Sequence, residues 1–237
     1  MSVWATSDLH GCLDAWKAIK TIVKPDDKIF VLGDCSDRGP QPWETLKTIY
    51  SDPQTILLKG NHEDMLVKAM RDYINYDGQC DRDYYRLASN GGAETFQQWS
   101  YLSPEMQAAW MHHLNKLPVF QEYTNENGFR ILMTHAGFTP VYNANDEIVI
   151  PDEHDAIWDR CHFTDPWPHG TEKVIIIHGH TPTIYLAEEL QLPKEEVEPG
   201  AMWYAHNHKI CIDCGCVFTG YTSLLNLDTF DEEVIAL

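Results

Sequence analysis

The sequence predicts an α/β layered fold. Short apolar runs alternate along the chain with segments in which apolar residues recur at helical spacing. Each apolar run ends in a cluster of Asp, His, Asn or Gly. Such runs are typical of strands buried on both faces, and their alternation with helices indicates a layered sheet whose strand ends carry the chemistry.

The elements of this pattern follow one another in a regular order. The expected strands cover residues 3–6, 29–32, 55–58, 131–133 and 174–177. Helical spacing is present over residues 13–23, 43–49 and 65–70, between the first strands. Near the end, residues 209–213 and 221–227 are two further runs, which we expect to form antiparallel strands of a second sheet.

Two longer segments interrupt the alternation. Residues 71–116 are mostly polar with helical spacing, which predicts an inserted helical cap. Residues 137–171 are rich in Pro, Asp and Trp and predict loops beside the site. Because no internal repeat and no linker is present, we expect one domain over residues 1–237.

The composition argues against several classes of partner. A formal net charge of -19, with only 17 Lys and Arg, disfavours binding to nucleic acid or to an anionic membrane surface. The first charged residue is Asp8, too early for the apolar stretch of a signal peptide, and no run is long enough to span a bilayer. Seven cysteines, an odd number, fit reduced thiols better than a disulfide framework. These features predict a cytoplasmic location.

Potential metal ligands follow five of the expected strands. Asp8 and His10 are two residues apart on an extended segment, so their side chains point the same way and can bind one ion together. Asp34 could bridge to a second ion. The remaining ligands of that ion would be Asn61, His135 and His180. This set of oxygen and nitrogen atoms suits Mn, Fe, Zn or Mg, so we expect two divalent metal ions, with manganese preferred.

This arrangement suits phosphoryl transfer. Two cations roughly 3.5–4 Å apart would lower the pKa of a shared water and hold the attacking oxygen in line with the leaving group. Arg38 could give a two-pronged contact to phosphate oxygens. His62 begins a predicted helix and could donate a proton to the leaving alkoxide, while Asp37 could hold the imidazole in the required tautomer.

The chain resembles the phosphoprotein phosphatases, whose signature blocks have the form GDxHG, GDxxDRG and GNHE. Here the blocks are residues 7–11, 33–39 and 60–63, and the first opens with Ser7 in place of glycine. Their spacing and the short chain look like the compact bacterial and phage branch of serine/threonine phosphatases. The resemblance implies the calcineurin-like metallophosphoesterase fold, in which two mixed β-sheets pack as a sandwich flanked by helices, with the metals at the sheet edge.

The same resemblance implies a role for each site residue. The first metal would be held by Asp8, His10 and Asp34. The second would be held by Asp34, Asn61, His135 and His180. Arg38 and Arg160, the latter in a Trp-Asp-Arg tripeptide, would bind the substrate phosphate, and the pair of Asp37 and His62 would supply the acid.

These features predict a metal-dependent phosphomonoesterase that acts by direct attack of a hydroxide bridging the two metals. The expected partner is a phosphoprotein or phosphopeptide carrying phosphoserine or phosphothreonine, with phosphotyrosine and small esters as further substrates. One alternative is a symmetrical diadenosine tetraphosphate hydrolase, which has similar signature blocks. Another is a catalytically silent binding module, against which the complete set of ligands argues.

Other His and Cys residues have simpler interpretations. We expect His178 to be an interior histidine or one that supports a metal ligand. Oxidation of Cys12 or Cys35 would disturb the adjacent metal-binding residues, although small packing residues are the favoured interpretation. A third group consists of Cys211, Cys214 and Cys216. These three lack the partner pair expected of a zinc site, which favours core packing.

Overall fold

The structure, a computed structural model, describes residues 1–76, 78–79, 82–145, 147–193 and 197–237. Its strands are β1 Val3–Thr6, β2 Lys28–Val31, β3 Thr55–Leu57, β4 Phe120–Thr124, β5 Arg130–Thr134, β6 Val141–Tyr142, β7 Ile148–Val149, β8 Val174–His178, β9 Met202–Tyr204, β10 Lys209–Cys211, β11 Tyr221–Asn226 and β12 Glu232–Ala236. Its α-helices are α1 Leu13–Ile22, α2 Pro42–Ser51, α3 Asn61–Asn75, α4 Arg82–Ser89, α5 Ala93–Ser100, α6 Pro104–Asn115, α7 Glu153–Trp158, α8 Thr183–Glu189 and α9 Cys216–Thr219.

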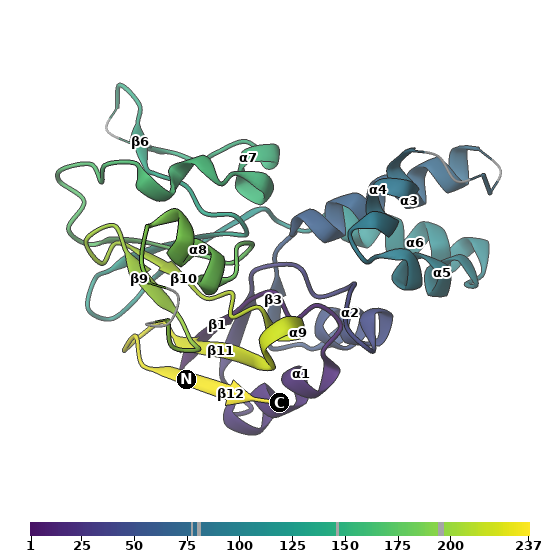
Figure 1. Ribbon diagram of the computed structural model, residues 1–237, viewed down its shortest axis with the longest axis horizontal. Coiled ribbons are helices and arrows are strands. Elements are labelled where there is room, and N and C mark those ends of the chain that lie inside the picture. The colour runs from purple at the N-terminus through teal and green to yellow at the C-terminus, as the bar shows by residue number, and fades with distance from the viewer. Residues whose placement is uncertain (77, 80–81, 146, 194–196) are drawn as a thin grey trace.

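The strands form two five-stranded mixed sheets within the described residues (Figure 1). The first has the order β12-β11-β1-β2-β3 and the second the order β4-β5-β8-β10-β9, while β6 and β7 pair as a separate hairpin. In the first sheet β1, β2 and β3 run parallel, and in the second β8 is parallel to both β5 and β10. Because the carboxyl ends of parallel strands meet at one edge, the residues that follow these strands can converge.

An apolar core lies between the two sheets. It combines Val3 and Phe30 of the first sheet with Ile131 and Ile177 of the second. A larger cluster, which includes Trp16 of α1, covers the opposite face of the first sheet and continues into the helices. The predicted sandwich of two mixed sheets flanked by helices is confirmed.

The helices α3, α4, α5 and α6 extend away from the sheets as one helical layer, coloured blue to teal in Figure 1. Their residues cover the segment that the sequence predicts to be a helical insertion. Helix α3 begins at Asn61, directly after β3, so its first turn lies at the sheet edge. The side chain of Ser103 caps α6 by accepting a hydrogen bond from the Met106 amide. The first helix of this layer therefore begins next to the candidate metal ligands.

The tail of the chain departs from the expectation. Strand β11 joins the first sheet, antiparallel to β1, and β10 joins the second, parallel to β8 and antiparallel to β9. The two runs are therefore not partners in one sheet. Leu225 packs in the core between the sheets and Leu224 in the helical cluster, which is the environment of a strand covered on both faces. An apolar run indicates such burial but does not specify the neighbouring strand.

Residues 137–171 were expected to form loops, but the structure shows short elements there. The hairpin of β6 and β7, the helix α7 and a 3-10 turn at Cys161–Thr164 all lie in this segment. The side chain of Asp152 caps α7 through the Asp155 amide, a local signal that the composition obscures. Among the described residues, no helix has the length and apolar character needed to cross a bilayer.

Candidate functional site

The predicted metal ligands converge at the edge where the parallel strands end. Asp8 follows β1, Asp34 follows β2 and Asn61 follows β3, while His135 and His180 follow β5 and β8 of the second sheet. All of these side chains are buried. The structure therefore brings together residues from five strands and both sheets, as the order of the sequence blocks predicts.

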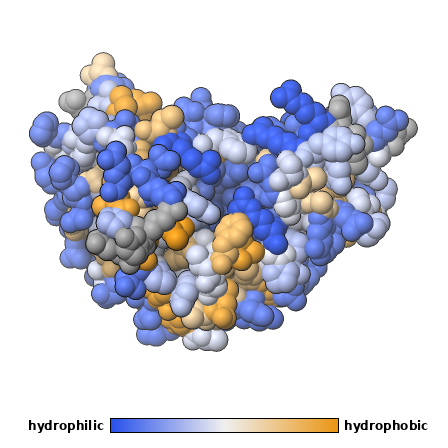
Figure 2. All heavy atoms as spheres, viewed as in Figure 1, coloured by the Kyte–Doolittle hydropathy of each residue, from blue (hydrophilic) through white to orange (hydrophobic). Residues whose placement is uncertain are grey.

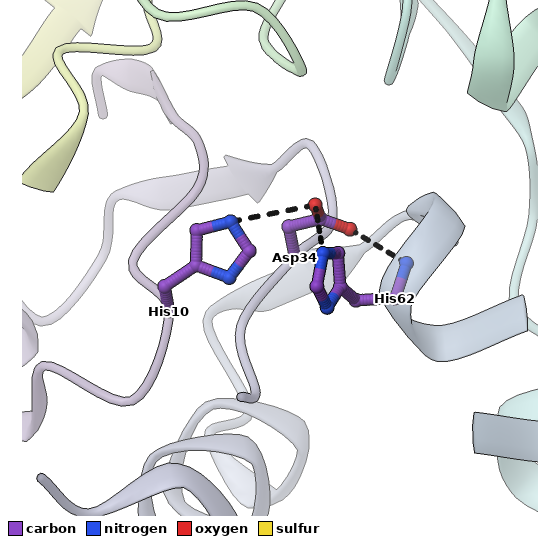
Figure 3. A group of neighbouring side chains, drawn as sticks. All are labelled: His10, Asp34 and His62. Atoms are coloured by element: carbon purple, nitrogen blue, oxygen red, sulfur yellow. Dashed lines mark hydrogen bonds and ion pairs between the residues drawn. The ribbon is translucent and has the colours of Figure 1, made fainter. Parts of the chain in front are cut away.

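Asp34 lies at the centre of the site. Its Oδ2 is 3.5 Å from Nε2 of His10 and 3.9 Å from Nε2 of His62, and its Oδ1 is 3.5 Å from Nε2 of His135. Figure 3 shows the rings of His10 and His62 on either side of this carboxylate, which also accepts a hydrogen bond from the His62 amide. Asp34 belongs to two groups of side chains that could each hold a metal ion. One contains His10 and His62, and the other contains His135 and His180.

The hydrogen bonds of His135 indicate that its group, which also contains Asp34 and His180, can hold a cation. Nδ1 of His135 lies 2.7 Å from the carbonyl oxygen of Leu32, which can only accept, so Nδ1 carries the proton. In the neutral ring, Nε2 of His135 therefore carries a lone pair and no proton. It nevertheless faces two acceptor oxygens, Oδ1 of Asn61 at 2.9 Å and Oδ1 of Asp34 at 3.5 Å. Three lone-pair atoms that face one another require a positive charge between them.

The pKa values reflect this requirement. Burial by itself lowers the pKa of His135, but the charges of Asp34 and Asp8 outweigh burial and raise it to about 10. Nδ1 of His180 is 3.0 Å from Oδ1 of Asn61 and 3.2 Å from Nε2 of His135, so it faces the same point. The donors of this group thus fit a divalent cation, which would take the place of the proton on His135.

Asp8 lies at the margin of the site. Its Oδ1 is 4.0 Å from Nε2 of His10, and its Oδ2 accepts hydrogen bonds from the Ser7 hydroxyl and from the His180 amide. Nδ1 of His10 lies 3.0 Å from the Ser36 carbonyl oxygen, so Nε2 is the atom that offers a lone pair to the site. Ser7, which replaces the usual glycine of the first signature block, therefore supports the orientation of Asp8.

The backbone at the site is held in an uncommon conformation. Several site residues have positive φ, namely Asp8, His10, Asp34, Asp37, Arg38 and His180. Non-glycine residues in this region carry strain and cluster at functional sites. Gly60 allows a close approach, because a Cβ at that position would lie 2.1 Å from Oδ1 of Asp34. The ligand positions are therefore set by backbone geometry as well as by side-chain rotamers.

Glu63 positions the loops that carry the ligands, a role that the sequence interpretation missed. Its carboxylate is buried and accepts hydrogen bonds from the amides of Asp34, Cys35 and Gly60 at 2.8, 3.0 and 2.9 Å. Burial, together with the charge of Asp34, raises the pKa of Glu63 to about 7. The available signal was its place as the last residue of the Gly-Asn-His-Glu block.

The predicted acid pair is in direct contact. Nδ1 of His62 lies 2.6 Å from Oδ2 of Asp37, and both side chains are fully buried. Burial lowers the pKa of His62, but the Asp34 charge and the Asp37 hydrogen bond outweigh it, so the pKa is raised above its ordinary value. The hydroxyl of Thr95, on helix α5, donates to the other oxygen of Asp37 at 2.5 Å.

Both predicted phosphate-binding arginines lie at the site. The guanidinium of Arg38 is 2.6 Å from Nε2 of His10 and 2.8 Å from Nε2 of His62. Nε of Arg160 donates to the Thr181 hydroxyl at 2.9 Å, and its terminal nitrogen donates to the carbonyl of His180 at 3.4 Å. The first arginine points into the group around Asp34, and the second lies over the loop that carries His180.

The remaining His and Cys residues lie outside the two ligand groups. His178 is buried and its ring nitrogens contact the Tyr204 hydroxyl and the Gly179 carbonyl, as expected of an interior histidine. Cys35 is fully buried, and burial raises the pKa of its thiol well above the usual range. The other buried cysteines here are Cys12, Cys211, Cys214 and Cys216. Among the described residues no cysteine belongs to a metal-binding group.

Comparison with known families decides the general chemistry. The sequence pattern of the calcineurin-like phosphoesterases matches residues 1–210. The chain belongs to this family. As a calcineurin-like phosphoesterase, it is a metal-dependent hydrolase of phosphoric esters, and its buried Asp and His groups could hold the divalent metal ions.

Curated relatives of this phosphoesterase extend over its whole length. One from Azotobacter vinelandii is 39% identical over 282 residues, covering 97% of this chain and 94% of its own. One from Pseudomonas syringae pv. tomato is 24% identical over 284 residues, covering 98% of this chain and 88% of its own. Both are named symmetrical bis(5'-nucleosyl)-tetraphosphatases.

Solved structures confirm the fold. A protein serine/threonine phosphatase from Saccharomyces cerevisiae superposes with a TM-score of 0.61 at 13% identity, covering 100% of this chain and 80% of its own. A metallophosphoesterase from Sphaerobacter thermophilus gives 0.55 at 16% identity, covering 100% and 88%. These neighbours share the architecture with the present phosphoesterase, and its substrate must be argued from the site and the relatives.

Proposed function

We propose that this phosphoesterase hydrolyses dinucleoside tetraphosphates symmetrically, which yields two nucleoside diphosphates. The observation that supports this most directly is the set of full-length relatives, which are named for that activity. The sequence alone placed this activity second to a serine/threonine phosphatase. The relatives reverse that order, because the signature blocks are common to both and do not separate them.

A hollow lined by residues close in sequence to His135 and Arg160 supports the proposal. Its volume is about 500 Å³, and it includes Gly137, two residues after His135, and Asp159, which precedes Arg160. Its walls also contain Phe138, Pro140, Val149, Asp155 and Asp165. Apolar walls with a few carboxylates suit a nucleoside, whose base is flat and whose ribose presents hydroxyl donors. A nucleoside in this hollow would lie next to Asp159, the residue that precedes Arg160.

The metal ligands of the proposal are those that the sequence predicts. Asp8, His10 and Asp34 would hold one divalent ion. The other would be held by Asp34, Asn61, His135 and His180. When bound, the two ions would neutralise phosphate charge and lower the pKa of a water molecule, and manganese is the first ion to test.

The protein side chains would perform the remaining tasks. Arg38 and Arg160 would bind phosphate oxygens, because a planar guanidinium can donate two parallel hydrogen bonds to them. His62 would carry the proton required by the leaving group on Nε2, since Nδ1 is bonded to Asp37. Because a guanidinium can only donate, Arg38 would have to turn from this nitrogen to the phosphate oxygens. The carboxylate of Asp37, fixed by Thr95, would keep the ring in that orientation.

A competition assay tests the substrate. Purified protein with manganese would receive diadenosine tetraphosphate and a phosphoserine peptide at equal concentration, and the products would be separated by chromatography. We expect higher kcat/KM for the dinucleotide and ADP as its only nucleotide product. Formation of ATP with AMP would contradict symmetrical cleavage, and preference for the peptide would restore the protein phosphatase as the better assignment.

A further inference from the structure

Arg86 lies against the site from the helical insertion. It is on α4, and its guanidinium carbon is 4.5 Å from the ring centroid of Trp158, the last residue of α7. The ring of Trp158 is in turn edge-on to His180, with 6.2 Å between centroids. A cation stacked on an aromatic face is held in place without using its hydrogen-bond donors. Arg86 is therefore positioned one ring away from a candidate metal ligand.

The donors of this guanidinium are available. Within the described part of the chain, the Arg86 side chain has no hydrogen bond or ion pair, and the residue is exposed. Its backbone carbonyl accepts from Ser89 and Asn90, which ties the end of α4 but leaves the side chain free. Five N–H groups on a fixed plane, directed away from the stacking face, match the oxygens of a phosphate group.

The end of the helix that carries Arg86 is connected to the arginine that points into the site. The carbonyl of Asn90, one turn further along, accepts a hydrogen bond from Nε of Arg38 at 3.3 Å. The chain contains six arginines in a total charge of -19. Arg38 and Arg160 contact candidate ligands directly, and Arg86 contacts the ring of Trp158, which lies against His180. Figure 2 shows the surface hollowed between the helical insertion and the rest of the molecule, with hydrophilic residues on both sides. A local concentration of cations on an acidic protein is typical of a site for a multiply charged anion.

We propose that Arg86, held on Trp158, binds the substrate phosphate group next to the one that is attacked. The inference rests on the proposed function, because a phosphomonoester has no second phosphate whereas a dinucleoside tetraphosphate has several. Arg38 and Arg160 serve the phosphate at the metals, and Arg86 extends the binding site along the polyphosphate chain. Arg86 is thus a specificity-determining residue, which selects polyphosphates over monoesters.

The test compares a one-phosphate ligand with a two-phosphate ligand. Hydrolysis of p-nitrophenyl phosphate would be measured with orthophosphate or with imidodiphosphate, a non-hydrolysable analogue of pyrophosphate, as inhibitor at constant free manganese. In Arg86→Ala we expect the inhibition constant of imidodiphosphate to rise about 10- to 100-fold, the range of a charge-assisted hydrogen bond. The inhibition constant of orthophosphate and the KM for p-nitrophenyl phosphate should stay within about twofold of wild type.

Three variants make the result specific. Arg71→Ala removes the same charge from the insertion, but its guanidinium is bonded to Asn115, so imidodiphosphate inhibition should be unchanged. Arg86→Gln keeps the length of the side chain without its charge and should behave like Arg86→Ala. Trp158→Phe keeps an aromatic face and should give a smaller effect than loss of the charge.

Failure of this inference is distinguishable from failure of the proposed function. If Arg86→Ala weakens both inhibitors equally, or leaves imidodiphosphate inhibition unchanged, Arg86 only joins the insertion to α7 and the inference is wrong. If imidodiphosphate inhibition depends on Arg86 but diadenosine tetraphosphate is not hydrolysed by wild type, the phosphate site stands and the substrate assignment falls.

Discussion

His62 and Asp37 form a hydrogen bond of 2.6 Å between two side chains that are both fully buried. The contact fixes the tautomer of the imidazole, because Asp37 accepts from Nδ1 and Nε2 remains directed toward Asp34 and Arg38. The charge of Asp34 and this bond together raise the pKa of His62 against the opposing effect of burial. A protonated histidine at this position can supply a proton to a leaving group.

The first prediction concerns this proton. We expect His62→Asn to lower kcat for phenyl phosphate by about 10²- to 10⁴-fold, the usual contribution of a general acid. The loss should be much smaller for 2,4-dinitrophenyl phosphate, whose leaving group needs no proton. Stopped-assay kinetics on both esters would measure the difference. Equal losses on the two esters, with unchanged metal stoichiometry, would show that His62 has another role.

The second prediction concerns the support of Asp37 by the insertion. Replacing Thr95 with Val removes the hydroxyl that donates to the buried carboxylate, so the free energy of unfolding should fall by about 1.5–3 kcal/mol. Thr45→Val is the matched control, since Thr45 is equally buried but donates to the neutral carbonyl of Gln41, and should lose about 0.5–1.5 kcal/mol. Urea denaturation gives both values. Equal losses would mean that the Thr95 bond is not charge-assisted.

The third prediction concerns Glu63, whose carboxylate holds the amides of Asp34, Cys35 and Gly60. In Glu63→Gln the side-chain amide would meet backbone donors, so the loop that carries Asp34 should shift and manganese affinity should fall about 10- to 100-fold. Calorimetric titration would measure this. Glu44→Gln, on the exposed face of α2 and paired with Lys47, should keep wild-type affinity. Wild-type affinity in Glu63→Gln would remove its assigned role.

The fourth prediction is a pH effect on stability. Lys209 is fully buried in β10 and donates to the Thr139 hydroxyl and the His162 carbonyl. Burial lowers its pKa from 10.5 to about 8, against the charges of Asp165 and Asp159. Between these two values the unfolded chain binds more protons than the folded chain, so this residue makes stability rise with pH, by about 3 kcal/mol over the interval.

Lys209→Met isolates that contribution. Other groups titrate in the same range, so the informative quantity is the difference in free energy of unfolding between wild type and Lys209→Met at pH 7.5 and pH 10. We expect wild type to gain stability relative to the variant as the pH rises. A constant difference would mean that Lys209 keeps its ordinary pKa in the folded protein.

The sequence alone was sufficient for the fold class and for the convergence of the candidate ligands. Each ligand follows an apolar run, and parallel strands bring such positions to one edge of a sheet. Asp34 and His135, 101 positions apart, follow strands of different sheets and meet because the two sheets pack with these edges together. The periodicity indicates the type of each element, and the position of each block directly after a strand carries the information. The strand that pairs with residues 221–227 could not be predicted in this way. These residues form an apolar run, which indicates a buried strand, but nothing in the run shows that its partner is β1.

The contacts of the insertion also lay beyond sequence reasoning. Thr95 and Arg86 lie on helices that carry many similar polar residues. The sequence does not show which of these residues contact the site, and only the packing of α4 and α5 identifies them. Glu63 is different, because its position in the third block was visible and only its function was missed. A motif specifies which residues are needed, whereas tertiary packing specifies which neighbours hold them.

The hydrogen bond from Thr95 to Asp37 matters when the helical insertion is exchanged between related enzymes. A transplanted helical segment would bring its own side chain to position 95, so grafting residues 71–116 from a relative would also change the contact that fixes Asp37. Shortening that segment would strip the carboxylate of a donor and expose the imidazole beside it to water. The helical insertion and the pair of His62 and Asp37 are therefore structurally coupled in this chain.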